Sequence, residues 1–263
     1  MKPLFFIDYD NTIFDHRTWS IPESAFRALE RLHTEGFKVI VASGRSLERL
    51  QRTETFQGRF WPDCVIASNG AAVEAEGKLL WEKYFDPKLQ KRIMDYVLEK
   101  GYCMTVNLNG QRCVSNIKRW QALNLDKQAG AEAEQAFFEL YHKRLPSFFL
   151  ADNPEAQHDL QEQFPEIKVL SMGDDKNGAD VIPRENGKAE GGRRILEYYR
   201  TSWKNTVVIG DSMNDLEFIQ KAALGIAMGN AMQAVRDAAD YVTGDIGEDG
   251  LWNAVDYACR WAG

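Results

Sequence analysis

Near the start of the chain a short apolar run leads directly into a pair of acidic residues. Residues 4–7 read LFFI, and Asp8 and Asp10 follow with Tyr9 between them. A short apolar run of this kind is typical of a strand that is buried on both faces, as in a parallel sheet. Residues two apart in extended chain point to the same side, so Asp8 and Asp10 share a side where the strand ends. Ligands of open α/β sheets bind beyond the carboxyl ends of the strands, which makes this pair a candidate site.

Two carboxylates this close repel each other, so the pair needs a cation or a proton to hold it together. A divalent metal ion would keep Asp8 ionised as a nucleophile, while Asp10 handles protons. Taken alone, the pair could also be a strand-end cap or part of a salt bridge, because acidic residues are common where loops begin.

After this run, strand-like and helix-like segments alternate along the chain. Ser20 precedes Ile21-Pro22-Glu23, which predicts an N-cap with proline in the first turn, and Gly36 is expected to stop that helix. The strand–helix–strand order predicts a parallel sheet with right-handed crossovers. Further strands are expected at 37–42, 64–67, 206–209, 224–227 and 241–242. Further helices are expected at 46–56, 188–201, 215–222 and 250–261, and one more follows residues 228–231 and ends near 239. A hairpin is expected at 71–75 and 78–82, turned at 76–77.

From residue 84 the regular alternation of strands and helices gives way to a mixture of helices and hairpins. The expected elements are a helix at 87–100, a hairpin of 102–108 and 112–117 turned at 109–110, a helix at 131–143, a strand at 147–151, a helix from 153 and strands at 167–171 and 179–182. This block predicts an α+β insertion of about 100 residues, an ordinary domain size. The fold class is therefore α/β, with a Rossmann-like parallel-sheet core of residues 1–83 plus 186–263 and an inserted α+β domain of residues 84–185.

The composition of the chain argues against nucleic acid and membranes as binding partners. The net charge of −7 argues against a nucleic-acid binder, but a few local cations and a metal can still dominate a site for a phosphorylated substrate. No stretch approaches the ~18–20 apolar residues of a membrane helix, and the four apolar residues before Asp8 are too few for a signal peptide. Since the four cysteines have no metal or redox spacing, we expect reduced thiols in a cytoplasmic protein without a membrane partner.

Several remote stretches place polar groups just after an expected strand or at a helix start. The carboxyl ends of parallel strands lie on one edge of a sheet, so we expect these groups to converge. Singly, each has an ordinary explanation: a turn, a solvated lysine or a helix cap. The stretches are Asp8/Asp10/Thr12, Ser43-Gly44, Lys188 and Asp211/Asn214/Asp215.

These stretches resemble a known family. Asp8-Tyr9-Asp10-Asn11-Thr12, Ser43-Gly44-Arg45, Lys188 and residues 210–215 (GDSMND) resemble, in order, the four signature motifs of the haloacid dehalogenase (HAD) superfamily. Residues 68–71 (SNGA), residues 227–231 (AMGNA) and the insertion between the second and third motifs are similar to its Cof-type sugar-phosphatase branch, with a C2 cap. The resemblance covers the whole chain.

The resemblance implies a Mg²⁺-dependent phosphatase, a phosphoric monoester hydrolase acting on small phosphorylated metabolites such as sugar phosphates. Asp8 would form an aspartyl-phosphate, and Asp10 would act as general acid and then as base. Asp8, Asp211 and the backbone carbonyl of Asp10 would bind Mg²⁺, and Asp215 would fix Lys188 or a metal-bound water. The groups implied to bind substrate or phosphate are Thr12, Ser43, Gly44, Arg45, Lys188 and Asn214.

Some local readings stay open. Arg45 either reaches the substrate or pairs with a carboxylate. The family usually has glycine where this chain has Asn11, and asparagine tolerates the left-handed backbone that such a turn requires. His16, His33, His142 and His158 lack ligand spacing, so surface or core roles are expected, although His16 is close enough to the first motif to line the mouth of the site.

Alternative functions also stay open. A phosphomutase of the same superfamily would pass the phosphoryl group to a second hydroxyl rather than to water. A catalytically inactive regulator that binds phosphorylated metabolites is a third reading. The intact set of Asp8, Asp10, Lys188 and Asp211 weighs against it. A dehalogenase is disfavoured, because Asp10 and the metal-binding acids would have no task. The sequence is compatible with a monomer, and the insertion is expected to select the substrate.

Overall fold

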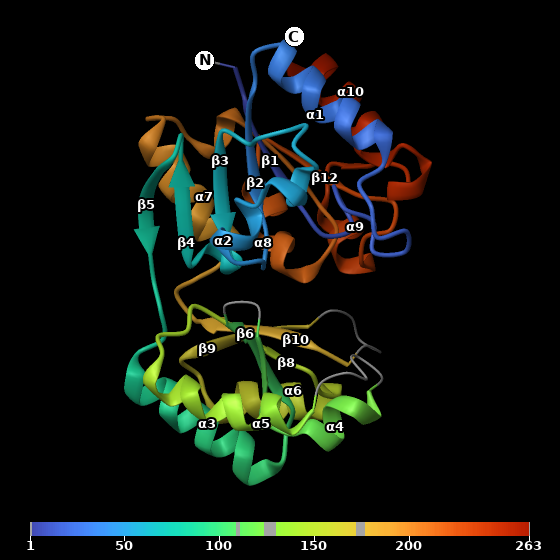
Figure 1. Cartoon of the computed structure of the whole chain (residues 1–263). Coiled ribbons are helices and arrows are strands. Elements are labelled where there is room, and N and C mark those ends of the chain that lie inside the picture. Colours follow the sequence, from blue (N-terminus) through green and yellow to red (C-terminus); the bar gives the residue numbers. More distant parts are fainter. Residues whose placement is uncertain (1, 109–110, 124–129, 172–176, 263) are drawn as a thin grey trace. The chain divides into compact units, whose positions relative to one another are not determined.

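The structure is a computed structural model that describes the 263-residue chain except residues 1, 109–110, 124–129, 172–176 and 263. The described residues form two compact units (Figure 1). Unit 1 contains Met1–Glu82 and Asn186–Gly263, and unit 2 contains Lys83–Glu185. None of the described helices is long and apolar enough to cross a membrane.

Unit 1 is built on one mixed sheet with the strand order β13-β12-β11-β1-β2-β3-β4-β5. The strands from β13 to β3 run parallel, and β4 and β5 join antiparallel at one edge. The first strand, β1, therefore lies in the middle of the sheet, between β11 and β2. The bounds are β1 Leu4–Asp8, β2 Lys38–Ala42, β3 Cys64–Ala67, β4 Ala72–Ala75, β5 Lys78–Glu82, β11 Thr206–Gly210, β12 Leu224–Ala227 and β13 Tyr241–Val242.

The apolar run of β1 explains this central position. All five residues of β1 are buried, as expected for a strand covered on both faces. The Phe5 ring packs edge-on against Phe37 at 4.9 Å, and the Phe6 ring against Phe218 at 5.0 Å. Because neighbouring side chains of a strand point to opposite faces, the two rings anchor β1 to different layers, each worth about 1.5–3 kcal/mol of burial.

Helices cover this sheet in pairs. In unit 1, α1 packs against α10, and α7 packs against α8 and against β3 and β4. Gly36 follows α1 with a φ of +75°, which confirms that it ends that helix. The bounds are α1 Glu23–Thr34, α2 Leu47–Leu50, α7 Lys188–Tyr198, α8 Met213–Lys221, α9 Gln233–Ala238 and α10 Gly250–Ala262.

The hairpin at the edge of the sheet forms as predicted. Its turn residues, Glu76 and Gly77, have φ values of 50° and 78°, the left-handed pair that a tight two-residue hairpin requires. Glu76 also accepts hydrogen bonds from Tyr198, the last residue of α7, and from Tyr199, which follows it.

Two predictions about unit 1 are wrong in detail. Ser20 does not cap α1; it pairs with Asp15 through two backbone hydrogen bonds, and Pro22 takes the capping position. The segment 46–56 is not one helix but α2 followed by a 3₁₀ turn at Thr53–Phe56. Its two buried side chains, Leu50 and Phe56, lie six residues apart, a spacing that would place them on different faces of one continuous helix.

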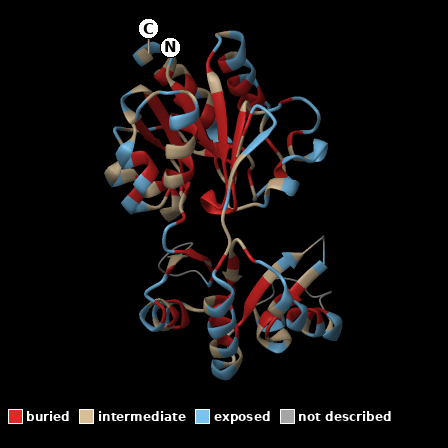
Figure 2. Ribbon diagram, turned by 90° about the vertical axis from the view of Figure 1, so that its left-hand side faces the viewer, coloured by how far each residue is buried: buried red, intermediate tan, exposed pale blue. Residues whose placement is uncertain are grey.

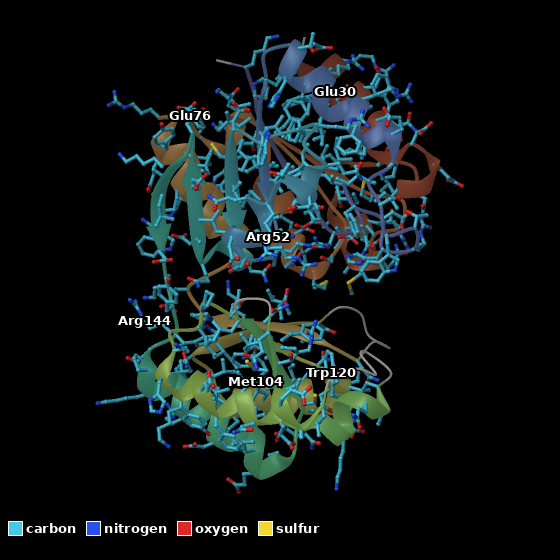
Figure 3. The ribbon with its side chains drawn as sticks, viewed as in Figure 1. Glu30, Arg52, Glu76, Met104, Trp120 and Arg144 are labelled. Carbon is cyan, nitrogen blue, oxygen red and sulfur yellow. The ribbon has the colours of Figure 1, made fainter. Side chains whose placement is uncertain are left out.

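Unit 2 is an α+β domain with its own core (Figure 2). Its strands are antiparallel in the order β7-β6-β8-β10-β9. Met104 lies in the larger apolar cluster and Trp120 in a smaller one (Figure 3). The bounds are α3 Pro87–Lys100, β6 Met104–Leu108, β7 Gln111–Val114, α4 Ile117–Ala122, α5 Ala131–Phe137, β8 Phe148–Leu150, α6 Pro154–Gln163, β9 Ile167–Ser171 and β10 Ala179–Pro183.

Unit 2 corrects two expected elements. The second hairpin strand ends at Val114 rather than 117, because the Asn116 side chain accepts a hydrogen bond from the Arg119 amide and starts the unpredicted helix α4. The helix expected at 131–143 ends at Phe137 and continues as a 3₁₀ turn at Phe138–His142. The hairpin turn predicted at 109–110 lies outside the described residues.

Candidate active site

Asp8 is buried at the carboxyl end of β1 in unit 1. Asp8 is 4% exposed, and its Oδ1 accepts a hydrogen bond from Lys188 Nζ at 2.5 Å. Its Oδ2 is also buried and accepts no hydrogen bond from any residue that the structure describes. A buried carboxylate oxygen without a donor is costly, so Asp8 Oδ2 favours a further positive partner.

Lys188 is the first residue of α7 and is completely buried. Its ammonium group donates to Asp8 and also to Asp215 Oδ1 at 2.7 Å. Burial acts to lower the pKa of Lys188, but Asp215 and Asp8 outweigh it and raise the pKa above its usual value. The ammonium therefore stays charged, and the unfavourable position of a lysine at a helix N-terminus is compensated by two carboxylates.

A close backbone contact between Gly70 and Gly187 positions the start of α7. Gly70, with a φ of +88°, follows β3, and a β-carbon there would lie 2.1 Å from the carbonyl oxygen of Gly187. Only glycine fits this contact, so Gly70 lets the loop after β3 pack directly against the residue that precedes Lys188.

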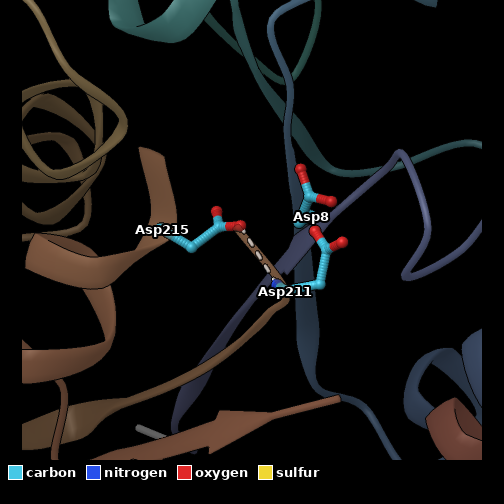
Figure 4. Close-up of side chains that lie close together, drawn as sticks. All are labelled: Asp8, Asp211 and Asp215. Carbon is cyan, nitrogen blue, oxygen red and sulfur yellow. Dashed lines mark hydrogen bonds between the residues drawn. The ribbon is translucent and has the colours of Figure 1, made fainter. Parts of the chain in front are cut away.

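The loop after β11 supplies Asp211 and Asp215. Asp215 Oδ2 accepts the backbone N–H groups of Asp211 and Ser212 at 3.2 and 3.3 Å, as the N3 residue of a capping box on α8. Figure 4 shows Asp8, Asp211 and Asp215 together with the first of these hydrogen bonds. Each of the three offers a carboxylate oxygen that lies within 4.8 Å of the others. We call Asp8, Lys188, Asp211 and Asp215 the Asp8 cluster.

The charges of the Asp8 cluster fit a divalent cation. Burial raises the pKa of Asp8 well above its usual value; Lys188 opposes the shift, and the neighbouring carboxylates of Asp215, Asp211 and Asp10 add to it. Asp215 already accepts the Lys188 ammonium and two amides, which leaves Asp8 and Asp211 as the better ligands. All donors are oxygens, the set that Mg²⁺ prefers.

Asp10 lies in a different environment from Asp8. Its Oδ1 accepts hydrogen bonds from His16 Nε2 at 2.7 Å and from Arg45 Nη2 at 2.6 Å. Burial acts to raise the pKa of Asp10, but the hydrogen bonds from His16 and Arg45 and the charge of Arg45 outweigh it and lower the pKa to about 2. Of the two readings of Arg45, the structure shows the one in which it pairs with a carboxylate. His16 also contacts this carboxylate, so it has neither a core role nor a purely surface role.

Ser43 joins this second group from the loop after β2. Its hydroxyl lies 3.3 Å from Asp10 Oδ2 and accepts the Arg45 amide at 3.1 Å. The backbone of Asn69 donates to the Ser43 carbonyl, which ties the loops after β2 and β3 together around Gly44. We call Asp10, His16, Ser43 and Arg45 the Asp10 cluster.

The remaining predicted residues lie on the loops around these clusters. Asn11 adopts a φ of 59°, which confirms that asparagine supports the left-handed turn, and its carbonyl accepts the side-chain amide of Asn230 at 2.9 Å. Thr12 is fully buried, and its hydroxyl has no hydrogen-bond partner among the described residues. Asn214 donates its amide to Asn69 Oδ1 at 3.0 Å.

The loops after β1, β2 and β11 thus bring the predicted polar groups to one edge of the sheet, as their positions after adjacent strands suggest. Sequence reasoning missed two contacts, His16 with Asp10 and Asn69 with Asn214. The SNGA stretch was a usable signal for Asn69, whereas the nearness of His16 to the first motif was a weak one.

Known proteins of one family are similar to this chain over nearly its whole length. The sequence model of the haloacid dehalogenase-like hydrolases matches residues 5–255. The chain is similar to the YkrA protein of Bacillus subtilis (strain 168), at 27% identity over 255 residues and 96% of each chain. It is 24% identical, over 96% of its length and 94% of the relative's, to the 5-amino-6-(5-phospho-D-ribitylamino)uracil phosphatase YcsE of the same bacterium.

Solved structures show the same fold. A HAD phosphatase from Bacteroides thetaiotaomicron superposes with a TM-score of 0.83, 23% identity and coverage of 98% of this chain and 95% of that one. A HAD subclass IIB sugar phosphatase superposes with a TM-score of 0.79, 24% identity and coverage of 98% and 99%.

Proposed function

Because the chain belongs to the haloacid dehalogenase-like hydrolases, in the Cof-type branch that its motifs predict, and is a phosphoric monoester hydrolase, we propose that it uses Mg²⁺ and Asp8 to hydrolyse small phosphorylated metabolites. Sugar phosphates are the substrate class that the Cof-type motifs favour. The observation that carries the proposal is the Asp8 carboxylate: one oxygen contacts Lys188, and the other is buried without a donor among the described residues.

In the first half-reaction a carboxylate oxygen of Asp8 attacks the phosphorus atom. The bond from phosphorus to the substrate's alcohol oxygen breaks, and Asp10 transfers its proton to that oxygen as it leaves. The products are the free alcohol and an aspartyl-phosphate on Asp8. Lys188 keeps Asp8 ionised and oriented for the attack.

In the second half-reaction a water molecule attacks the phosphorus of the aspartyl-phosphate. Asp10, now a carboxylate, accepts a proton from that water, and the bond from phosphorus to Asp8 breaks. Phosphate leaves and both carboxyl groups return to their starting states. A pKa of about 2 makes Asp10 a carboxylate in the structure, which is the base form of this second half-reaction. The proton that Asp10 gives to the leaving oxygen in the first half-reaction would be taken up when a protonated phosphate ester binds beside it.

Asp8, Asp211 and the backbone carbonyl of Asp10 would hold Mg²⁺, which supplies positive charge that reduces repulsion between Asp8 and an anionic substrate. Ser43, the Gly44 amide, Lys188 and Asn214 would hold the phosphoryl oxygens, where negative charge spreads in the transition state. The Thr12 hydroxyl is buried and has no hydrogen-bond partner in the part of the chain that the structure describes, which supports a place for Thr12 in the same group.

We propose that side chains of unit 2 select the leaving group, as expected of an inserted domain in this family. The four free cysteines, Cys64, Cys103, Cys113 and Cys259, support a reducing, cytoplasmic location. The acidic net charge of −7 supports a small-molecule substrate rather than nucleic acid.

The test is phosphate release from p-nitrophenyl phosphate and from a panel of primary alkyl phosphates, including hexose 6-phosphates and glycerol 3-phosphate, with Mg²⁺ and with EDTA. We expect Mg²⁺-dependent turnover by the wild type and none by Asp8→Asn. Retained turnover by Asp8→Asn would exclude Asp8 as the nucleophile. Free sugar and phosphate as products support hydrolysis, whereas an isomerised sugar phosphate would support a mutase.

A further inference from the structure

The loop between β1 and α1 holds an imidazole against the carboxylate that is expected to move protons. We propose that His16 is a positioning residue for Asp10: it anchors Oδ1, so that Oδ2 is left to exchange the proton with the leaving oxygen and with water. This inference rests on the proposed phosphatase function and adds to it a residue that lies outside the four signature motifs.

The two oxygens of Asp10 are held unequally. Oδ1 accepts the two shortest hydrogen bonds, from His16 Nε2 at 2.7 Å and from Arg45 Nη2 at 2.6 Å. Oδ2 has longer contacts, with Arg45 Nε at 3.1 Å and with the Ser43 hydroxyl at 3.3 Å. Since Ser43 is itself a proposed phosphate ligand, Oδ2 is the oxygen on the side where substrate would bind.

This division suits both states of the proton-transfer group. A carboxylate accepts hydrogen bonds at both oxygens, whereas a carboxylic acid donates from one oxygen and still accepts at the other. With the proton on Oδ2, His16 and Arg45 keep their acceptor at Oδ1. The anchored oxygen can therefore stay in place through both half-reactions while Oδ2 gives up and regains the proton.

The imidazole is itself fixed in position. Its ring packs edge-on against Phe14 at 5.2 Å and against Trp19 at 5.3 Å. Trp19 is 73% exposed and has a φ of 54°, a left-handed backbone that is rare and costly for so large a side chain. A strained backbone conformation such as that of Trp19 persists only where contacts with neighbouring residues hold it in place.

Contacts within the loop that contains His16 hold this backbone conformation in place. Asp15 and Ser20 are joined by two backbone hydrogen bonds that close the loop. Arg17 forms ion pairs with Asp15 and with Asp245, which ties the loop to the segment before α10. A side chain held from several directions in this way is typical of one that must orient a reacting group.

A second histidine provides a matched control. His33 Nε2 contacts Asp63 Oδ2 at 3.1 Å, and its ring stacks on Phe60 at 4.7 Å. The two imidazoles are similarly exposed, 38% for His16 and 37% for His33. His33 lies in the last turn of α1, and Asp63 precedes β3, at the opposite end of the strands from the Asp8 and Asp10 clusters.

The expected signature is selectivity between leaving groups. An alkoxide needs a proton as it leaves, whereas p-nitrophenolate is stable as an anion and needs none. The ratio kcat/KM reports the steps up to the release of the alcohol. Loss of His16 should therefore lower kcat/KM for a primary alkyl phosphate much more than for p-nitrophenyl phosphate.

The experiment compares the wild type, His16→Leu, His16→Gln, His33→Leu and His33→Gln on p-nitrophenyl phosphate and on the best primary alkyl phosphate of the panel. We expect His16→Leu to lower kcat/KM by at least about tenfold for the alkyl ester and by less than about threefold for the aryl ester. His16→Gln keeps an N–H donor and should recover part of the loss. Both His33 variants should match the wild type.

Equal losses on both esters, or no loss, in a folded His16→Leu protein would overturn the positioning role while leaving the phosphatase proposal intact. A wild type that turns over neither ester would overturn both proposals, and one that turns over only the aryl ester would overturn the positioning role. If His16→Leu does not fold, Trp19→Ala takes its place, because it removes one support of the imidazole and should give a smaller loss of the same selectivity.

Discussion

Asp8 and Asp10 lie two residues apart, yet their side chains accept hydrogen bonds from different residues. The Asp8 cluster is deeply buried, and Lys188 is the cation that contacts its carboxylates. In the Asp10 cluster, two partly buried side chains, His16 and Arg45, contact one carboxylate that is itself about one third exposed, at 32%. The pKa of Asp8 is raised by burial, and that of Asp10 is lowered to about 2 by its hydrogen bonds.

The comparison shows how one residue type can take two tasks. A buried carboxylate such as Asp8, with one oxygen on Lys188 and no donor to the other among the described residues, favours a cation and an electrophile nearby. A carboxylate held by donors on one oxygen, such as Asp10, is suited to move a proton at the other. The different surroundings of Asp8 and Asp10 shift their pKa values in opposite directions and so suit the two residues to different roles.

The largest expected effect is loss of the nucleophile. Asp8→Asn should lower kcat/KM by at least about 10⁴-fold on alkyl and aryl phosphates alike, because a carboxamide is a far weaker nucleophile than a carboxylate. Phosphate release under saturating Mg²⁺ measures the effect. Asp256→Asn, an exposed aspartate of α10 paired with Arg31, should retain wild-type activity.

The next prediction compares the cation of each cluster. Lys188→Met leaves Asp8 and Asp215 buried without their shared partner and should lower the free energy of unfolding by about 3–5 kcal/mol. Arg45→Met leaves Asp10 with His16 and Ser43 and should cost only about 1 kcal/mol. Urea unfolding of both variants provides the comparison, and similar losses would contradict the difference in burial.

The role of Asp10 should depend on the leaving group. Asp10→Asn removes the proton donor and should lower kcat/KM by about 10²-fold for the alkyl phosphate, with a clearly smaller loss for p-nitrophenyl phosphate. An equal loss on both esters would mean that Asp10, like Asp8, acts directly on phosphorus. Steady-state kinetics on the two substrates distinguishes these outcomes.

Metal binding should stabilise the Asp8 cluster. At 100 times its dissociation constant, Mg²⁺ should raise the free energy of unfolding by about 2.7 kcal/mol, since the folded protein alone holds the site. Asp211→Asn should lose most of this gain, and Asp256→Asn none of it. Thermal unfolding with and without Mg²⁺ measures the gain, and a full gain in Asp211→Asn would remove that residue from the ligand set.

The smallest expected effect is on acid stability. Because the pKa of Asp10 is about 2 in the folded protein, below its usual 3.8, its ion pairs stabilise the fold above pH 4, and this contribution is lost as the pH falls towards 2. After allowance for solvent exposure, the loss is about 1 kcal/mol. Urea unfolding between pH 5 and 2 should show it in the wild type and not in Asp10→Asn.

The elements with the clearest local signals were predictable from sequence. The bounds of β3 and β12 match the predicted ranges: the apolar run of β3 ends at the polar Ser68, and that of β12 ends one residue before Gly229. The helix α3 also matches, since Asp86 caps it, Pro87 opens it and Gly101 closes it with a φ of 68°. The segment 46–56 was harder, because its few apolar residues favour no single period.

The site was predictable as a set of positions but not as a set of contacts. Strand ends and motif order place Asp8, Lys188 and Asp211 on one edge of the sheet. The contact of Arg45 with Asp10 depends on side-chain rotamers, and that of Asn214 with Asn69 joins residues 145 apart in the sequence. Neither a rotamer nor such a distant side-chain contact follows from periodicity or capping.

The most direct test is to find where the phosphoryl group is bound during turnover. The wild type, mixed with p-nitrophenyl phosphate and Mg²⁺, is quenched in acid within the first turnovers, digested and analysed by mass spectrometry. We predict a phosphoryl group on Asp8 of the peptide that contains residues 4–12, and none in Asp8→Asn. A phosphoryl group on Asp10 or on another residue, or turnover without any phosphorylated peptide, would contradict the assignment of Asp8 as the nucleophile.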